Sequence, residues 1–133
     1  MNLRAFPIAL LALAACGKSA EKPATPAAPP APAATGQTIV IETYSDAQGN
    51  YFKPNQIQAH KGDVLRFTLV SGVHNVHFLP DSNPGKTGLP AASEFLQIPG
   101  QTIDIPVTFE PGTYYFQCDP HALLGMKGHL VVQ

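Results

Sequence analysis

The sequence predicts an all-β fold, a Greek-key β-sandwich or barrel of about seven to eight short strands. Short apolar stretches alternate with polar residues at the two-residue period of a strand, and no amphipathic helical stretch of ordinary length occurs. Turn dipeptides that contain glycine separate these stretches at short intervals. They are Gly49-Asn50, Lys61-Gly62, Ser71-Gly72, Pro84-Gly85, Pro99-Gly100 and Pro111-Gly112.

Residues 1–15 are predicted to be an export signal and not part of the fold. A short basic start that contains Arg4 precedes the apolar stretch 5–15, which is too short to span a bilayer. The run Leu13-Ala14-Ala15-Cys16 resembles the lipobox of bacterial lipoproteins, and this resemblance implies cleavage before Cys16 and acylation of its thiol. The alternative is a plain signal peptide cleaved nearby, with Cys16 incidental.

A lipid on Cys16 would hold the protein at a membrane surface. More than one acyl chain gives a stable anchor, whereas a single chain holds a protein only marginally. By the same resemblance, Gly17 after the acylated cysteine favours the outer membrane where two membranes are present. We therefore expect an exported protein that is lipid-anchored at the cell envelope and faces the periplasm.

Residues 16–36 are predicted to combine the lipidated cysteine with a tether rich in proline and alanine. The stretch has few bulky apolar side chains and cannot bury a core. Proline favours extended polyproline II at about 3.1 Å per residue, so residues 18–36 can reach roughly 60 Å. A proline-rich recognition motif is the alternative. The folded domain is then expected to cover residues 37–133.

Several stretches of this domain carry strand patterns. Their residues are β-branched, aromatic or alternately apolar, as in the series Ile103, Ile105 and Val107. The stretches are 37–44, 63–71, 102–109 and 113–116. A short helical turn fits residues 91–96.

Cys118, His121 and Met126 bring a thiolate, an imidazole and a thioether together in the spacing Cys-x2-His-x4-Met. Soft sulfur ligands suit Cu(I), and imidazole suits copper generally. His74 stands where a neighbouring strand can deliver a second imidazole. One Cys and two His in a trigonal arrangement, with a long axial Met, make a blue-copper electron-transfer site. Zinc fits less well, because a thioether is not among its usual ligands.

Each of these residues alone has a structural explanation, as a buried cysteine, a turn histidine or a core methionine. Their combination directly after the strand-like run 113–116 favours a metal site. The number of cysteines also favours a metal site. With Cys16 assigned to the lipid, Cys118 is the only thiol of the domain and has no partner for an internal disulfide. Coordination would deprotonate this thiol and occupy it in an oxidising compartment.

Residues 37–133 resemble a small type I copper protein, a cupredoxin of the plastocyanin and pseudoazurin kind. The specific landmarks are Pro111-Gly112-Thr113-Tyr114 and the loop 118–126. Supporting landmarks are Phe52 with Pro54 and Ile57, Gly62-Asp63-Val64, His74-Asn75-Val76, Phe95-Leu96 and Pro99-Gly100. The resemblance implies that one copper ion is bound by His74, Cys118, His121 and Met126. It also implies that Asn75 bridges the two ligand-bearing segments by hydrogen bonding.

The other histidines of the domain are not expected to bind the metal. His77 lies three residues beyond His74, so it should face the opposite side of a strand with alternating side chains. The same alternation predicts that His60 and His129 are surface residues at strand ends. In plastocyanin-like chains the position of His77 is usually aliphatic, so this residue departs from the family pattern.

The charge of the chain does not indicate which class of partner it binds. A formal charge of −1 provides no basic patch for nucleic acid and no acidic run. Gln117 stands where plastocyanin-like chains have Tyr, which puts the lateral electron route of those proteins in doubt. The apolar run Ala122-Leu123-Leu124, beside His121, is predicted to dock redox proteins in small contacts below about 1,200 Å². The alternative is that Leu123 and Leu124 only pack the loop.

We therefore expect a monomeric, membrane-tethered one-electron carrier that exchanges electrons with redox proteins and is not an enzyme. The alternative is a copper-binding or copper-delivery lipoprotein, for which an extra Met or His cluster would be expected, and only Met126 lies in the domain. A copper enzyme needs a second copper centre or domain that about 97 residues cannot hold. No Gly-x-Ser-x-Gly hydrolase motif is present either.

Overall fold

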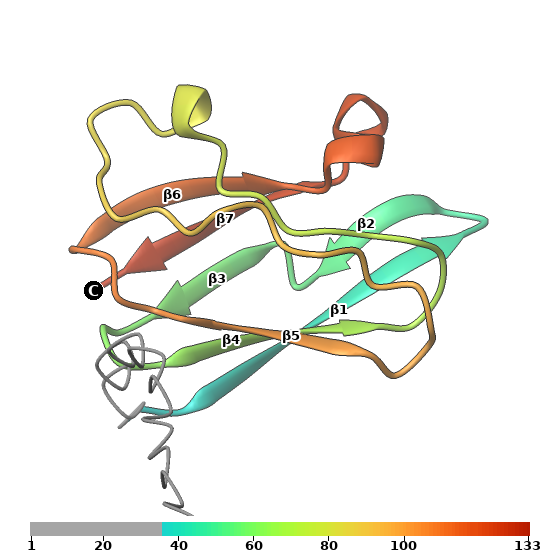
Figure 1. Ribbon diagram of the computed structural model, residues 1–133, viewed down its shortest axis with the longest axis horizontal. Coiled ribbons are helices and arrows are strands. Elements are labelled where there is room, and N and C mark those ends of the chain that lie inside the picture. The colour runs from blue at the N-terminus through green and yellow to red at the C-terminus, as the bar shows by residue number, and fades with distance from the viewer. Residues whose placement is uncertain (1–35) are drawn as a thin grey trace, which may run out of the picture.

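A computed structural model describes residues 36–133, which form two β-sheets packed face to face (Figure 1). The strands are β1 (Thr38–Asp46), β2 (Gly49–Lys53), β3 (Gln56–Ala59), β4 (Val64–Leu69), β5 (Thr102–Pro106), β6 (Gly112–Gln117) and β7 (Lys127–Val132). Two short 3-10 helices are η1 (Pro80–Ser82) and η2 (Asp119–Leu124). The predicted all-β sandwich is confirmed. The predicted export signal, the lipidation site Cys16 and almost all of the tether lie outside the described residues.

One sheet has the strand order β2-β1-β4-β5, and the other has the order β3-β7-β6. β1 runs parallel to β4, and their register pairs Thr38 with Val64 and Thr43 with Leu69. The chain therefore leaves both strands at the same end of the sandwich. In the described residues, no helix is long and apolar enough to cross a membrane.

The core between the sheets is built around aromatic side chains. Phe116 on β6 contacts Phe52, Phe67 and Phe78 with ring centroids 5.0, 5.6 and 5.5 Å apart. All four rings are buried, and each contributes about 1.5–3 kcal/mol through the hydrophobic effect. Side chains of β6 alternate across the sheet, so the inward side that holds Phe116 also receives Cys118. The packed core thus continues directly into the cysteine.

The helical turn expected at residues 91–96 is absent, and this prediction was wrong. Leu96 instead pairs with His74 through two backbone hydrogen bonds, N–H to O, of 2.8 and 3.1 Å. The backbone N–H of Ser93 donates to the carbonyl of Val76, and the hydroxyl of Ser93 accepts from the N–H of Val76. This long-range pairing uses the backbone groups that a helical turn would need. It also fixes the position of His74.

Candidate metal centre

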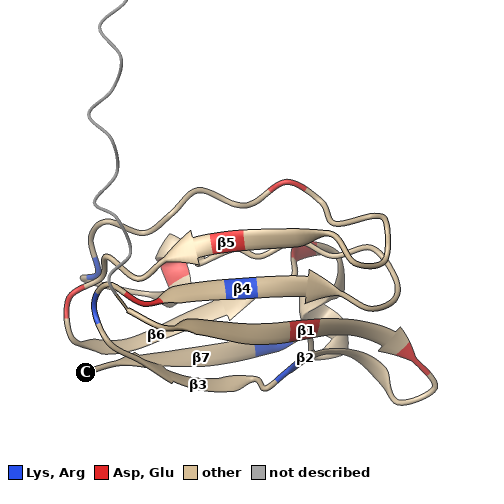
Figure 2. Cartoon of the chain, turned by 90° about the horizontal axis from the view of Figure 1, so that it is seen from below, with Lys and Arg blue, Asp and Glu red and all other residues tan. Residues whose placement is uncertain are grey.

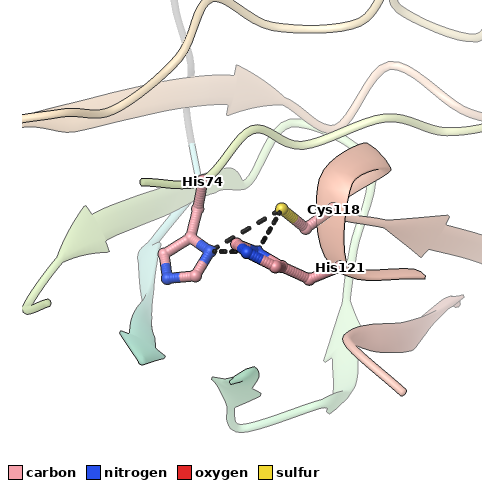
Figure 3. A group of neighbouring side chains, drawn as sticks. All are labelled: His74, Cys118 and His121. Atoms are coloured by element: carbon pink, nitrogen blue, oxygen red, sulfur yellow. Dashed lines mark hydrogen bonds between the residues drawn. The ribbon is translucent and has the colours of Figure 1, made fainter. Parts of the chain in front are cut away.

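Three potential metal-binding side chains converge at one end of the sandwich, where Figure 3 shows them pointing toward one another. Cys118 follows β6 directly, His121 lies in η2, and His74 lies between β4 and η1. The Sγ atom of Cys118 is 3.6 Å from Nδ1 of His74 and 3.5 Å from Nδ1 of His121. The two Nδ1 atoms are 3.2 Å apart. Among the residues that the structure describes, no other group of three His, Cys, Asp or Glu side chains is gathered this closely.

The loop from Cys118 to Met126 is closed by its own backbone. The N–H of Cys118 donates to the carbonyl of Met126, and the N–H of Met126 donates to the carbonyl of His121, both at 3.1 Å. Gly125 ends η2 with a φ of 93°, a left-handed conformation that glycine adopts without strain. Met126 is fully buried at the end of this loop. The Cys-x2-His-x4-Met spacing therefore corresponds to one closed loop that leaves β6 and leads into its neighbouring strand β7.

The ring of His74 is held so that Nδ1 faces the site. The other ring nitrogen, Nε2, lies 2.9 Å from the carbonyl oxygen of Ser71. A carbonyl only accepts hydrogen bonds, so Nε2 carries the proton and Nδ1 keeps a free lone pair. Burial lowers the pKa of His74, which keeps the imidazole neutral. A neutral ring with an anchored N–H is the form that binds metal ions.

Cys118 lies in an environment that favours the thiol until a cation is present. Burial raises the pKa of Cys118, while backbone N–H groups of Asn75 and His121 at the sulfur oppose this rise. A cation beside the sulfur would displace the thiol proton. The site thus couples metal binding to the release of one proton.

The spacing of the donor atoms fits a single ion. Bonds of about 2.0 Å to nitrogen and 2.3 Å to sulfur, spread by about 105–120°, separate two nitrogens by about 3.2–3.5 Å. The same bonds separate nitrogen from sulfur by about 3.4–3.7 Å. The observed separations of 3.2, 3.5 and 3.6 Å match both ranges. His74, Cys118, His121 and the buried Met126 therefore fit one copper ion, which combines imidazole with soft sulfur ligands.

Asn75 links the two segments that carry these donors. Its Oδ1 accepts from the backbone N–H of Asp119 at 2.8 Å, and its Nδ2 donates to the Asp119 carboxylate at 2.9 Å. Asn75 follows His74, and Asp119 follows Cys118, so this pair of bonds ties the two segments side by side. The further role of Asn75 in orienting bound copper stays a prediction.

The remaining histidines of the domain do not belong to the group of three donors. Nδ1 of His77 is 3.0 Å from the Asp119 carboxylate, and its backbone pairs with Gln117. His60 is exposed after the end of β3, as expected. The prediction for His129 was wrong, because this residue is half-buried within β7 and its ring lies edge-on to Tyr115. β7 is the central strand of its sheet, and the His129 ring is flanked by Tyr115 on β6 and by Gln56 on β3.

Two features of the site were not predicted from the sequence. Asp119 accepts hydrogen bonds from the side chains of Asn75 and Gln117. Ser45 on β1 places its hydroxyl oxygen 3.2 Å from Nε2 of His74. The position of Asp119 beside Cys118 was a usable signal for the first. Nothing local in the sequence marks Ser45, because 29 residues separate it from His74.

Comparison with known proteins agrees with this geometry. The model of the family described as copper binding proteins, plastocyanin/azurin family, matches residues 39–133. The chain belongs to the plastocyanin/azurin family. A plastocyanin from Ulva prolifera is 38% identical over 97 residues, which cover 71% of this chain and 98% of that protein.

Solved structures of the same family have the same fold. Oxidised plastocyanin from Dryopteris crassirhizoma is 32% identical with a TM-score of 0.56, and the match covers 71% of this chain and all of that one. A pseudoazurin from Sinorhizobium meliloti is 28% identical with a TM-score of 0.53, and covers 74% of this chain and 75% of its own. The predicted resemblance to cupredoxins of the plastocyanin and pseudoazurin kind is confirmed. The protein is a type I copper electron carrier and not an enzyme.

Proposed function

We propose that the protein carries single electrons between redox proteins while a lipid on Cys16 tethers it to a membrane surface. The observation that carries this proposal is the convergence of His74, Cys118 and His121, with donor atoms 3.2–3.6 Å apart. In this proposal those three residues and Met126 would hold the copper ion. Bound copper would supply the one-electron chemistry, and the chain holds its donors in one arrangement.

The exposure of the donors supports a route for electrons through His121. His74 and Cys118 are fully buried, whereas His121 reaches the surface in part. Leu123 and Leu124 follow it in η2 with exposed fractions of 101% and 67%. This exposure argues against the alternative that Leu123 and Leu124 only pack the loop. Ala122, Leu123 and Leu124 then form an apolar docking rim beside the partly exposed imidazole, suited to a brief and small contact.

Charges on the domain favour an apolar contact over an electrostatic one. Figure 2 shows acidic and basic residues interspersed along the strands. Arg66, for example, donates two hydrogen bonds to Asp104 across the β4–β5 pair, at 2.8 and 2.7 Å. Paired charges of this kind cancel at a distance, so steering of a partner by the whole protein would be weak. We infer that the carrier works as a monomer and selects its partners at the docking rim.

The entry point of the chain supports a tether that leaves the site free. The N–H of Gly36 donates to the carbonyl of Gly62, and the N–H of Gln37 donates to the Asp63 carboxylate. Both contacts lie where β1 and β4 begin, and His74 follows the far ends of these strands. At about 3.3 Å per residue, β1 separates the two ends by roughly 25–30 Å. A lipid-linked segment would thus join the domain opposite the docking rim, because the start of β1 and the helix η2 lie at opposite ends of the sandwich (Figure 1).

We place the protein at the cell envelope, exported and facing the periplasm, with the outer membrane favoured where two membranes are present. The lipobox-like run that ends at Cys16 is the support for this assignment.

Two experiments test the proposed function. Spectroelectrochemical titration of the copper-loaded protein should show a reversible one-electron step. Expression with labelled palmitate should label the protein and should fail to label Cys16→Ser, and equal labelling of both would refute the lipid anchor.

A further inference from the structure

The protonated nitrogen of His74 faces two hydrogen-bond acceptors. Its Nε2 is 2.9 Å from the carbonyl oxygen of Ser71 and 3.2 Å from the hydroxyl oxygen of Ser45. The Ser71 carbonyl only accepts, so Nε2 bears the hydrogen. The Ser45 oxygen can therefore only accept from that same N–H. One imidazole N–H is shared between a loop carbonyl and a side chain on β1.

A second side chain orients the Ser45 hydroxyl. Asn50 on β2 is the direct cross-strand partner of Ser45, so both side chains lie on the same face of the hairpin. The Ser45 hydroxyl donates to Oδ1 of Asn50. With its only hydrogen used there, the Ser45 oxygen turns its lone pairs toward Nε2 of His74.

The backbone holds these groups in place from the other side. The N–H of Ser45 donates to Oγ of Ser71 at 2.9 Å, and the Ser71 hydroxyl donates back to the carbonyl of Ser45 at 2.8 Å. Gly72 has a φ of +89°, and a Cβ atom there would lie 2.7 Å from Cβ of Ser45 and 2.8 Å from Nε2 of His74. Only glycine permits this close approach. The contact between β1 and His74 is therefore built into the turn at 71–72.

We propose that Ser45 is a positioning residue for the metal centre, which fixes the ring of His74 and tunes the reduction potential through Nε2. The inference rests on the proposed role of His74 as a copper ligand. A hydrogen-bond acceptor on the remote N–H makes an imidazole a stronger donor at its other nitrogen. A stronger donor favours Cu(II) over Cu(I), which lowers the reduction potential. Ser45 and Asn50 thus connect the β1–β2 hairpin to the redox properties of the site.

Removal of this acceptor should shift the balance between the two copper states. A hydrogen bond of ordinary strength changes an equilibrium by about two- to tenfold. Ser45→Ala should therefore reduce the preference for Cu(II) over Cu(I) by that factor, and raise the one-electron potential by about 20–60 mV. Because the bond from Nε2 to Ser71 remains, copper binding itself should persist.

The test compares three variants of the copper-loaded protein by spectroelectrochemistry. Ser45→Ala should raise the potential, and Ser45→Thr, which keeps a hydroxyl on a β-branched strand residue, should stay near the wild-type value. Thr43→Val is the matched control. Thr43 is buried on the same strand and the same face, and its hydroxyl donates to the carbonyl of Thr68 at 3.3 Å. This control removes a buried hydroxyl of β1 without touching His74.

A second measurement reads the hydrogen bond directly. The ¹⁵N shift of His74 Nε2 in the copper-free protein should move in Ser45→Ala and stay unchanged in Thr43→Val. If Ser45→Ala does not fold, Asn50→Ala should raise the potential by a smaller amount in the same direction. The inference is refuted if Ser45→Ala leaves the potential and the ¹⁵N shift unchanged, or if Thr43→Val alters them equally. A wild-type protein without an intense thiolate-to-copper band would instead refute the proposed function.

Discussion

Replacement of Asn75 by alanine should weaken both the fold and the copper site. The Asn75 side chain is 3% exposed and makes two hydrogen bonds to Asp119, one from a backbone N–H and one to a carboxylate. The N–H left without an acceptor costs about 1–3 kcal/mol, and the lost bond to a charged group costs about 1.5–3 kcal/mol. Water can replace the second bond in part, because the Asp119 side chain is 37% exposed. We expect a loss of about 2–3 kcal/mol.

Thermal and urea unfolding of the copper-free protein measure this loss. For a domain of this size, it corresponds to a decrease in the melting temperature of about 10–20 °C. Because Asn75 joins the segments of His74 and Cys118, copper affinity should also fall by about 10–100-fold in a competition titration with a chelator. The visible spectrum should change with it.

Asn83→Ala is the matched control for this prediction. Asn83 is also buried, at 4% exposure, and its side chain makes three hydrogen bonds with the backbone of Leu79 and Tyr115. These bonds hold the backbone of β6 at Tyr115 and involve none of the donor residues. The control should lose comparable stability and keep its copper affinity and spectrum. Our reasoning fails if Asn75→Ala retains wild-type copper affinity, or if both variants lose it equally.

Three further changes test separate parts of the site. Met126→Gln should keep copper and lower the potential, because an oxygen or nitrogen donor favours Cu(II) more than a thioether does; an unchanged potential in a redox titration would contradict this. Burial lowers the pKa of His74 from 6.5, so the unfolded chain binds more protons than the copper-free fold as pH falls. The free energy of unfolding of the copper-free protein should therefore decrease below about pH 6.5 in urea titrations. The part of this decrease that comes from His74 should be absent in His74→Gln. Leu123→Lys should slow electron self-exchange, measured by NMR line broadening, and change stability by less than about 0.5 kcal/mol, because the side chain is fully exposed; wild-type exchange would argue against the docking rim.

The sequence was sufficient for features that depend on local patterns. Alternation predicted the strands that became β4 and β5, and β-branched or aromatic runs predicted those that became β1 and β6, although the exact ends differ by a few residues. The Cys-x2-His-x4-Met spacing predicted the loop 118–126, because all three side chains lie within one backbone turn. Glycine at 72 and 100 marked turns with positive φ.

Features that depend on long-range pairing were not predictable in the same way. Residues 93–96 pair with the segment that carries His74, and no local pattern announces this partner. His129 was mistaken for a strand-end residue. Its burial depends on where β7 begins and on the contact with Tyr115 of β6, and neither can be read from the local sequence. The contact of Ser45 with His74 likewise follows from the parallel pairing of β1 and β4. The serine at position 45 could not be singled out from the sequence, because serine is common in strands and turns alike.

The most direct test of the copper site is the visible absorption spectrum of the protein after addition of Cu(II) and then ascorbate. We predict an intense thiolate-to-copper band that bleaches with ascorbate, returns on reoxidation, and is absent in Cys118→Ser. Copper that binds without this band, or a Cys118→Ser protein that remains blue, would contradict the assignment of a type I site to His74, Cys118, His121 and Met126.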